Sequence, residues 1–360
     1  MPPRKMFSSP EQVKALTPKS ESIARGVREM MPSPTSKNPG FEFPGYEKRL
    51  PTEQEKDFID RADRAVDDAL RMFGMYNVPG IDTAEIRIHE RRAQNTSVKE
   101  PFHSAVPLGH TGVFYDMSLS AFRADRHDGA RMFLHSAIHE FFHAKSNNRW
   151  NIGVKTQRRI SGFNSVLSRT VPDEQGRLTM NPTADLFIGF TEAMTETLAV
   201  LTCEKLFATP WFQKTQRRNE SRTASLRKAY AESHHASDAM IVKISQNDAG
   251  AVEGLIPYFT EQFALKLMML RISDTLKIPY NTVLKTFVVD YIAGTMEHIK
   301  PLLRQTFGPD ILRVLSVWTP AKLSGEGNDL FLYLKATDPK TRDVMAKDYL
   351  TKRGSLPQSS

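Results

Sequence analysis

The stretch from Leu134 to Trp150 contains the motif H-E-x-x-H, formed by His139, Glu140 and His143. Residues four apart on a helix lie on one face, so the two imidazoles can point at one ion with Glu140 next to them. No Pro or Gly occurs from Ala130 to Trp150, which favours a helix throughout this stretch. Two histidine ligands beside a carboxylate are typical of a zinc site with a general base. We therefore expect this helix to organise the fold and to bind Zn²⁺.

A third histidine, His135, lies one turn before His139 on the same stripe of the helix. His135 and His143 are about 12 Å apart along the helix axis, so the three side chains cannot all bind one ion. The position of Glu140 directly after His139 selects His139 and His143 as the ligand pair. We expect His135 to be a packed or hydrogen-bonded neighbour. Asp125 or Asp128 is the expected cap at the start of this helix.

Composition and charge exclude several classes of protein. The single cysteine, Cys203, rules out a disulfide framework and a cysteine-rich zinc module, and its apolar surroundings predict a core position. The net charge of +8 is concentrated at the two ends, because residues 1–50 carry nine Lys/Arg against five Glu and residues 335–360 carry six against three Asp. The remaining body is nearly neutral, which argues against a specific nucleic-acid partner. No secretory leader or membrane-spanning run is evident, so we expect a cytoplasmic protein.

The pattern along the chain predicts four segments. Residues 1–50 are rich in Pro and Ser and are expected to form a disordered leader. Residues 51–208 are expected to form a catalytic half with the metal ligands, residues 209–350 a helical C-terminal subdomain, and residues 351–360 a disordered tail. The fold class is therefore predicted as α+β, with a small mixed sheet before the H-E-x-x-H helix and mostly helices after it.

Periodicity predicts the individual elements. Thr52 and Glu55 resemble a capping box that opens a helix ending near Phe73. Strands are expected at Ala84–Glu90 and Gly112–Ser120, and a hairpin with a turn around Pro172–Gly176 follows the histidine helix. A buried helix is expected from Asn181 to Phe207, and everything from Trp211 onward reads as helical. The later helices are expected at Phe212–Lys228 (or a linker there), Pro257–Ile272, Asn281–Ile292, His298–Phe307, Ile311–Trp318 and from Asp329.

Two glutamates in the predicted second helix are candidates for the third metal ligand. Glu192 and Glu196 are four residues apart in an otherwise apolar helix, and carboxylates are rarely buried there unless paired or bound to metal. We assign Glu192 as the third ligand and Glu196 as the acceptor of the outer N–H of a ligand histidine. The reverse assignment, with Glu196 as the ligand, and an exposed position for both remain open.

The two motifs together resemble those of the gluzincin metallopeptidases, the thermolysin-like branch of the zincins. In that family H-E-x-x-H on one helix is followed by a Glu on a second helix, with an acidic residue four positions later. Here His139, Glu140 and His143 match the first motif, and Glu192 and Glu196 match the second. The resemblance covers roughly Ala84–Phe207, and the R-R-I-S-G-F stretch before the second helix resembles bacterial zincin-like domains. Departures from the family are Thr191 in place of the usual Asn and 48 residues between His143 and Glu192.

The resemblance implies a zincin-like fold and a zinc-dependent metallopeptidase that acts on a peptide or protein substrate. Glu140 is the expected general base, and the strand Gly112–Ser120 is the expected edge for an extended substrate. A Tyr or His is also needed to stabilise the developing oxyanion. Tyr258 is the first choice, with Tyr291, His298 and the pair His234–His235 as further candidates.

Two other kinds of protein remain compatible with the sequence. One is a zinc-binding protein of zincin fold that has no general proteolytic activity and acts as an interaction or maturation module. The other is a helical interaction protein in which the H-E-x-x-H motif is accidental. The oligomeric state is not predicted.

Overall fold

The structure, a computed structural model, describes residues 46–76, 78, 86–91, 117–120, 128–146, 148–152, 156–172, 178–216, 221–246, 250–320 and 328–353. The described residues divide into two compact units. Unit 1 comprises those within Glu21–Lys145 and Leu198–Pro257, and unit 2 those within Ser146–Thr197 and Tyr258–Ser360. Both units are discontinuous in sequence, whereas the expected division into 51–208 and 209–350 is sequential. The expected leader lies almost entirely outside the described residues.

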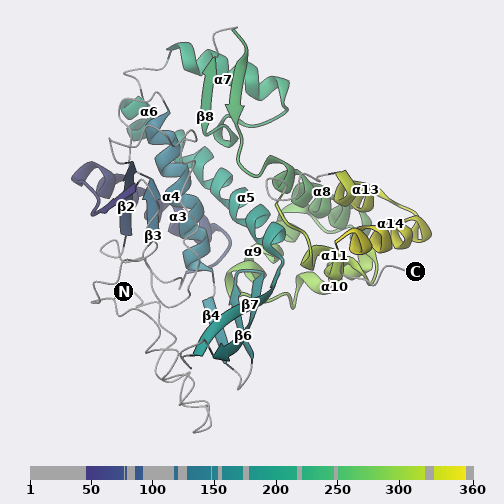
Figure 1. The fold of residues 1–360 in the computed structure, drawn as a ribbon. Helices are drawn as coiled ribbons and strands as arrows, with labels where there is room; N and C mark the ends of the chain where they lie inside the picture. The colour runs from purple at the N-terminus through teal and green to yellow at the C-terminus, as the bar shows by residue number, and fades with distance from the viewer. Residues whose placement is uncertain are drawn as a thin grey trace. The chain divides into compact units, whose positions relative to one another are not determined.

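Unit 1 begins with a small mixed sheet and two long helices (Figure 1). Strands β1 (Tyr46–Arg49), β2 (Ile86–Arg91) and β3 (Met117–Ser120) lie in that order, with β1 antiparallel and β3 parallel to β2. Helix α3 (Glu53–Met72) follows β1, and helix α4 (Gly129–Lys145) follows β3. The α+β class and the small mixed sheet before the histidine helix are thus confirmed. Of the predicted strand Gly112–Ser120, only the part from Met117 lies within the described residues.

Helix α3 begins as the sequence predicts. The Thr52 hydroxyl accepts a hydrogen bond from the Glu55 backbone N–H, and the Glu55 carboxylate accepts one from the Thr52 N–H. This reciprocal pair satisfies two of the N–H groups that a helix start leaves without partners. The apolar stripe of α3 is buried, and the Phe58 ring packs against Phe133 of α4 and edge-on against Trp211, with centroids 6.0 and 5.6 Å apart. Aromatic packing therefore fixes α3 beside α4.

The rest of unit 1 consists of the last part of α5 (Ile188–Phe207), α6 (Pro210–Gln216), α7 (Ser221–Ser233), the 3₁₀ turn η2 (Asp238–Met240) and a hairpin of β8 (Lys243–Gln246) and β9 (Val252–Leu255). The prediction that the chain is helical from Trp211 onward was wrong here. Each strand has only four residues, the shortest length over which alternation indicates a strand. The hairpin packs on α7 through Ile244, Ala231 and Tyr230, and a Cβ at Gly254 would lie 2.4 Å from the Tyr230 ring.

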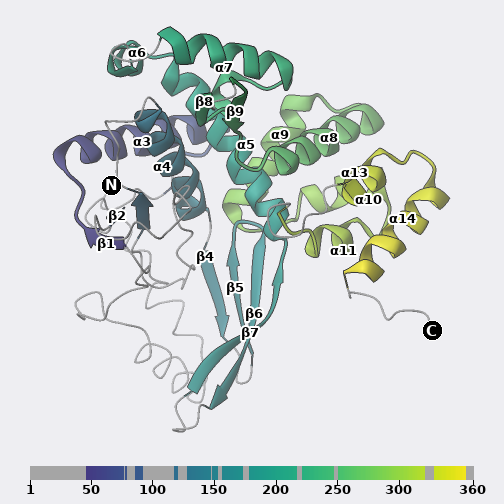
Figure 2. The same ribbon diagram turned by 45° about the horizontal axis from the view of Figure 1, so that its top comes forward.

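Unit 2 contains a four-stranded antiparallel sheet in the order β4 (Asn148–Ile152), β5 (Thr156–Ser161), β6 (Asn164–Pro172) and β7 (Leu178–Leu186) (Figure 2). The hairpin expected after the histidine helix is therefore confirmed, although its turn lies outside the described residues. Helix α4 ends at Lys145, five residues before the helix-compatible stretch ends at Trp150. The last residues of that stretch instead pair with β5, so sheet formation overrides their local helix preference.

The buried helix expected from Asn181 to Phe207 is shorter than predicted. Residues 178–186 form β7 at an edge of the sheet, where Pro182 is tolerated because an edge strand leaves some N–H groups without ladder bonds. Phe187 then adopts a left-handed conformation with φ of 65° and separates β7 from α5. Its N–H donates to the carbonyl of Ser316, so a tertiary contact holds the break.

The C-terminal part of unit 2 is helical, as predicted. Its helices are α8 (Phe259–Leu276), α9 (Tyr280–Ala293), α10 (Ile299–Phe307), α11 (Ile311–Ser316), α13 (Asn328–Lys335) and α14 (Pro339–Lys352). Cys203 is buried in α5, as expected. Among the described residues, none of the helices combines the length and the hydropathy that a bilayer crossing requires.

Asp290, which is fully buried near the end of α9, organises the turn into α10. Its carboxylate accepts hydrogen bonds from the backbone N–H groups of His298 and Ile299 and lies 2.6 Å from Nδ1 of the exposed His298 ring. The hydrogen bond to Asp290, with the charges of Asp290 and Glu297, raises the pKa of His298 above its usual 6.5. The protonated ring of His298 therefore stabilises the folded state more than the neutral ring does.

This contact predicts a pH-dependent contribution to stability. A histidine whose pKa is higher in the folded state stabilises fully below pH 6.5 and loses that contribution as pH rises through the folded pKa. We expect His298→Asn to lower the melting temperature more at pH 5.5 than at pH 9. The control is His234→Asn, because the His234 ring contacts a hydroxyl and a carbonyl group instead of a carboxylate. An equal loss for His298→Asn at both pH values would contradict the prediction.

Candidate metal centre

Helix α4 carries the three residues of the first motif in buried positions. His139, Glu140 and His143 are 8%, 7% and 2% exposed, respectively. The Nε2 atoms of the two histidines are 3.1 Å apart, and their rings meet edge-on at 70°. Two ring nitrogens that face each other at this distance need a proton or a cation between them, because their lone pairs otherwise repel. The α-helical spacing has thus produced the converging imidazole pair that the motif predicts.

Helix α5 supplies the third group. One ligand atom from each of His139, His143 and Glu192 lies within 4.8 Å of the other two, which makes this the one such group of three among the described residues. Glu192 is half-buried, and Glu196, one turn later, is fully buried. The alternative that both glutamates lie on an exposed face of the helix is therefore wrong for Glu196. The grouping also favours Glu192 over Glu196 as the ligand.

The dimensions of this group suit a small divalent ion. Zinc–nitrogen and zinc–oxygen distances of about 2.1 Å place two ligands of one tetrahedral ion about 3.4 Å apart. The histidine pair is already close to this spacing at 3.1 Å, and the widest pair would need to approach by about 1.4 Å at most. Glu192 has a flexible side chain, so a change of rotamer provides this movement. Two imidazoles and one carboxylate are also a usual donor set for a catalytic zinc, with one position left for water.

His135 is buried, at 3% exposed, on the same helix. It does not belong to the group of three that could hold an ion. The expectation that His135 is not a ligand agrees with this arrangement. Its burial is that of a neighbour packed inside the fold.

The C-terminus of α4 is held by an ion-pair cluster that sequence reasoning missed. The ammonium group of Lys145, two residues after His143, is buried and lies 2.7 and 2.6 Å from carboxylate oxygens of Asp63 and Asp67 on α3. Burial raises the pKa of Asp63 above its usual value, and Lys145 opposes that shift. A cation in the last turn also complements the helix dipole. These contacts fix the end of α4 that carries His143.

The N-terminus of α4 is held by a second cluster of charged groups, in which Asp128, Arg131 and Arg227 are buried. Asp128 immediately precedes the helix, pairs with Arg227 of α7 and accepts a hydrogen bond from the Ile244 N–H at 2.8 Å. Arg131, in the first turn, bonds to the Asp238 carboxylate at 2.9 Å and lies over the Phe207 ring at 4.4 Å. Burial and the nearby Arg227 lower the pKa of Arg131. The sequence suggests a capping role for Asp128, but nothing in it links this residue to partners about a hundred positions away.

The four candidates for an oxyanion donor occupy different settings. Tyr258, the first choice, is the residue before α8 and adopts a left-handed conformation with φ of 47°. Tyr291 is fully buried on α9, and its hydroxyl lies 2.6 Å from Oγ1 of Thr195 on α5. His298 is exposed and is bound to Asp290. The role of Tyr258 as the oxyanion donor remains a prediction.

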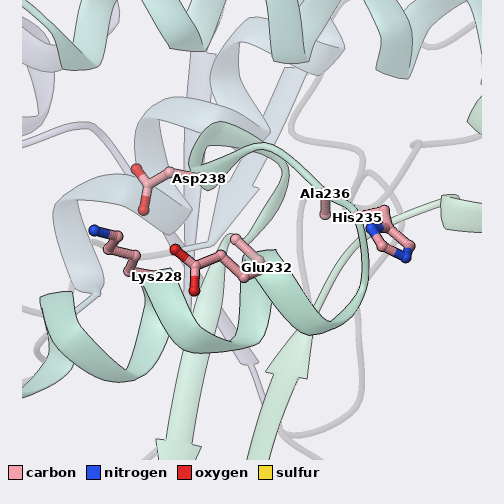
Figure 3. A pocket seen from close by; sticks show the side chains of 6 residues that line it. Lys228, Glu232, His235, Ala236 and Asp238 are labelled. Atoms are coloured by element: carbon pink, nitrogen blue, oxygen red, sulfur yellow. The ribbon is translucent and has the colours of Figure 1, made fainter.

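The pair His234–His235 belongs to a different feature of unit 1. His234 stacks on Tyr230 with ring centroids 3.9 Å apart. His235 lines a cavity of about 640 Å³ together with Lys228, Ala231, Glu232, Ala236 and Asp238. In Figure 3 the His235 ring points away from the carboxylates of Glu232 and Asp238, so these groups do not converge on a common point. This cavity lacks the focused donor set that the metal group has.

Comparison of the chain with protein-family models, with curated proteins and with solved structures finds no match. The candidate site is therefore defined by its own residues and their geometry.

The Arg227–Asp128 pair predicts a large effect on stability. Removal of one partner from a buried ion pair leaves the other charge uncompensated, which costs about 3–5 kcal/mol. We expect Arg227→Met to lower the free energy of unfolding in urea by this amount. Arg64→Met on the exposed face of α3 is the control, with an expected change within about 0.5 kcal/mol. Equal effects of the two substitutions would show that α4 does not depend on the cluster.

The grouping of the ligand atoms predicts that Glu192 is the metal ligand and that Glu196 is not. We expect Glu192→Ala to abolish stoichiometric zinc binding, because it removes one of the three candidate protein ligands. Glu196→Ala should retain zinc with an affinity reduced about 10–100-fold, as for residues that orient ligands. Elemental analysis would measure the zinc stoichiometry of each variant, and chelator competition would measure its zinc affinity. Glu204→Ala, at an exposed position of α5, is the control. Loss of zinc in Glu196→Ala and its retention in Glu192→Ala would assign the ligand role to Glu196.

Proposed function

We propose that the protein is a zinc-dependent metallopeptidase of zincin-like fold, with His139, His143 and Glu192 as the metal ligands. The observation that carries this proposal is the convergence of these three side chains, which the sequence motifs predict. A zinc ion held there supplies a Lewis acid and lowers the pKa of its water towards 7. Both effects promote peptide hydrolysis near neutral pH.

Glu140 is the proposed general base. It follows His139 directly on α4 and is 7% exposed, so its carboxylate is shielded from bulk water. In the proposed reaction Glu140 accepts a proton from the attacking water and transfers it to the leaving amine nitrogen. The carbon–nitrogen bond of the peptide breaks, and a carboxylic acid and an amine form. Glu196 is proposed to orient a ligand histidine by accepting its outer N–H.

The fold of unit 1 supports a peptide as the substrate. Strand β3 lies at one end of the three-stranded sheet, and no strand pairs with its outer side among the residues that the structure describes. An extended peptide can bind such an edge by adding a strand through main-chain hydrogen bonds. Strand β3 also contacts α4, the helix of the proposed base. The proposed substrate is therefore an extended peptide segment, and the cytoplasmic location remains a prediction.

The general base provides the test of this function. General acid–base catalysis contributes about 10²–10⁴-fold, so Glu140→Gln should lower the rate of casein cleavage by this factor while zinc stays bound. Glu204→Gln, the same chemical change at an exposed position of α5, should cleave like the wild type. Cleavage would be followed with fluorescent casein and zinc by elemental analysis.

Two other outcomes have a clear meaning. If the wild type binds zinc and cleaves no peptide or protein substrate, the zinc-binding module without proteolytic activity is the correct description. If the wild type binds no zinc, the metallopeptidase proposal fails altogether.

A further inference from the structure

A pair of hydroxyl groups lies inside unit 2 beside the helix that carries Glu192. The Tyr291 hydroxyl on α9 is 2.6 Å from Oγ1 of Thr195, and Oγ1 of Thr195 donates to the Thr191 carbonyl at 2.9 Å. A hydroxyl has one proton, and that of Thr195 is used on Thr191. The Tyr291 hydroxyl therefore donates to Thr195. The result is a directed chain of hydrogen bonds that ends on the backbone of α5.

This chain spans the turn of α5 that carries the proposed ligand. Thr191 directly precedes Glu192, and Thr195 follows it by three residues, so the side chains of Glu192 and Thr195 lie on one side of the helix. Glu196 is the next residue. The hydrogen bond between Tyr291 and Thr195 thus ties to α9 the turn of α5 that carries both glutamates.

The R-R-I-S-G-F motif holds the Tyr291 ring in place. Gly162 lies in the turn between β5 and β6 with φ of 56°, and a Cβ there would come within 2.5 Å of the Tyr291 ring. Phe163 packs edge-on against Tyr291 and stacks on Phe190 of α5, with ring centroids 5.5 and 4.5 Å apart. Only a residue without a side chain fits between this turn and the ring. The turn, the tyrosine and the start of α5 therefore form one packed assembly.

The polarity of the pair is not explained by packing. Tyr291 and Thr195 are both fully buried, and Phe and Val would fill the same space. Replacing both members of a buried hydrogen-bonded pair by apolar groups of similar shape is close to neutral for stability. The hydrogen bond between the two hydroxyl groups adds directionality to this contact. It restricts the two side chains to one arrangement, whereas apolar contacts alone would allow several.

We infer that Tyr291 is a positioning residue of the proposed metal centre, which acts through Thr195 to hold the turn of α5 that carries Glu192 in the position that zinc binding requires. This inference rests on the proposed function. Tyr291 is not assigned a contact with the substrate. Its effect is expected on the affinity for zinc.

The test compares zinc affinity with stability in the full chain. The dissociation constant for zinc would be measured by competition with a chromophoric chelator, and the melting temperature would be measured without metal. Tyr291→Phe and Thr195→Val should each raise the dissociation constant about tenfold, the lower end of the range for residues that orient metal ligands. The double variant should show a similar loss, because both substitutions break the same chain. Thr195→Ser, which keeps the hydroxyl, should bind zinc like the wild type.

Tyr333→Phe is the matched control. Tyr333 is also a buried tyrosine of unit 2, and its hydroxyl donates to the Phe307 carbonyl between α13 and α10. This variant loses one buried tyrosine hydrogen bond but leaves α5 untouched, so its zinc affinity should not change. A purely structural role of Tyr291 predicts instead that Tyr291→Phe and Tyr333→Phe behave alike.

The possible results separate this inference from the proposed function. If the wild type binds zinc and the double variant binds it equally well, the positioning role is overturned while the metal centre stands. An effect of Tyr291→Phe on zinc affinity no larger than that of Tyr333→Phe also overturns the positioning role. If the wild type binds no zinc, both the metal centre and the positioning role fall. A tenfold loss in the double variant with a wild-type melting temperature supports the inference.

Discussion

The converging pair of imidazoles on α4 is the constraint on which the rest of the site depends. Two ring nitrogens 3.1 Å apart are unfavourable without a proton or a cation between them. Their position requires α4 to be held firmly, and the structure holds it at both ends. Lys145 ties its last turn to α3, and Asp128 ties its start to α7 and β8. Both attachments are ion pairs with a buried member, Lys145 in one and Asp128 in the other, and their directional bonds fix a helix more closely than apolar contacts do.

Helix α5, which carries Glu192, is supported in a different way. Helix α5 begins directly after the left-handed Phe187, and its first turns are packed by Phe163, Trp318 and Tyr291. Thr195 in these turns contacts the Tyr291 hydroxyl, and Glu196 beside it is fully buried. Burial of Glu196 in such surroundings is unfavourable unless its carboxylate is hydrogen-bonded or paired. This buried carboxylate is the one that we propose to orient a ligand histidine.

The hairpin β8–β9 and the break before α5 show where local patterns fail. Residues 181–186 are compatible with a helix by composition, yet they complete a sheet with β6. The hairpin strands are only four residues long, so their local signal is weak, and they pack on Ala231 and Tyr230 of α7. In both cases long-range pairing decides the conformation, because the local free-energy difference between helix and strand is small.

The sequence by itself determined the elements whose causes are local. These are the capping box of α3, the helical spacing of His139 and His143, the α+β class and the spacing of the two glutamates on one helix. Only the tertiary structure decided which groups meet. The choice of Glu192 for the ligand group, the clamps at Lys145 and Asp128, and the contact between Tyr291 and Thr195 join residues that are separated by 49 to 116 positions. No local propensity encodes such contacts, because they arise only when separate helices pack together.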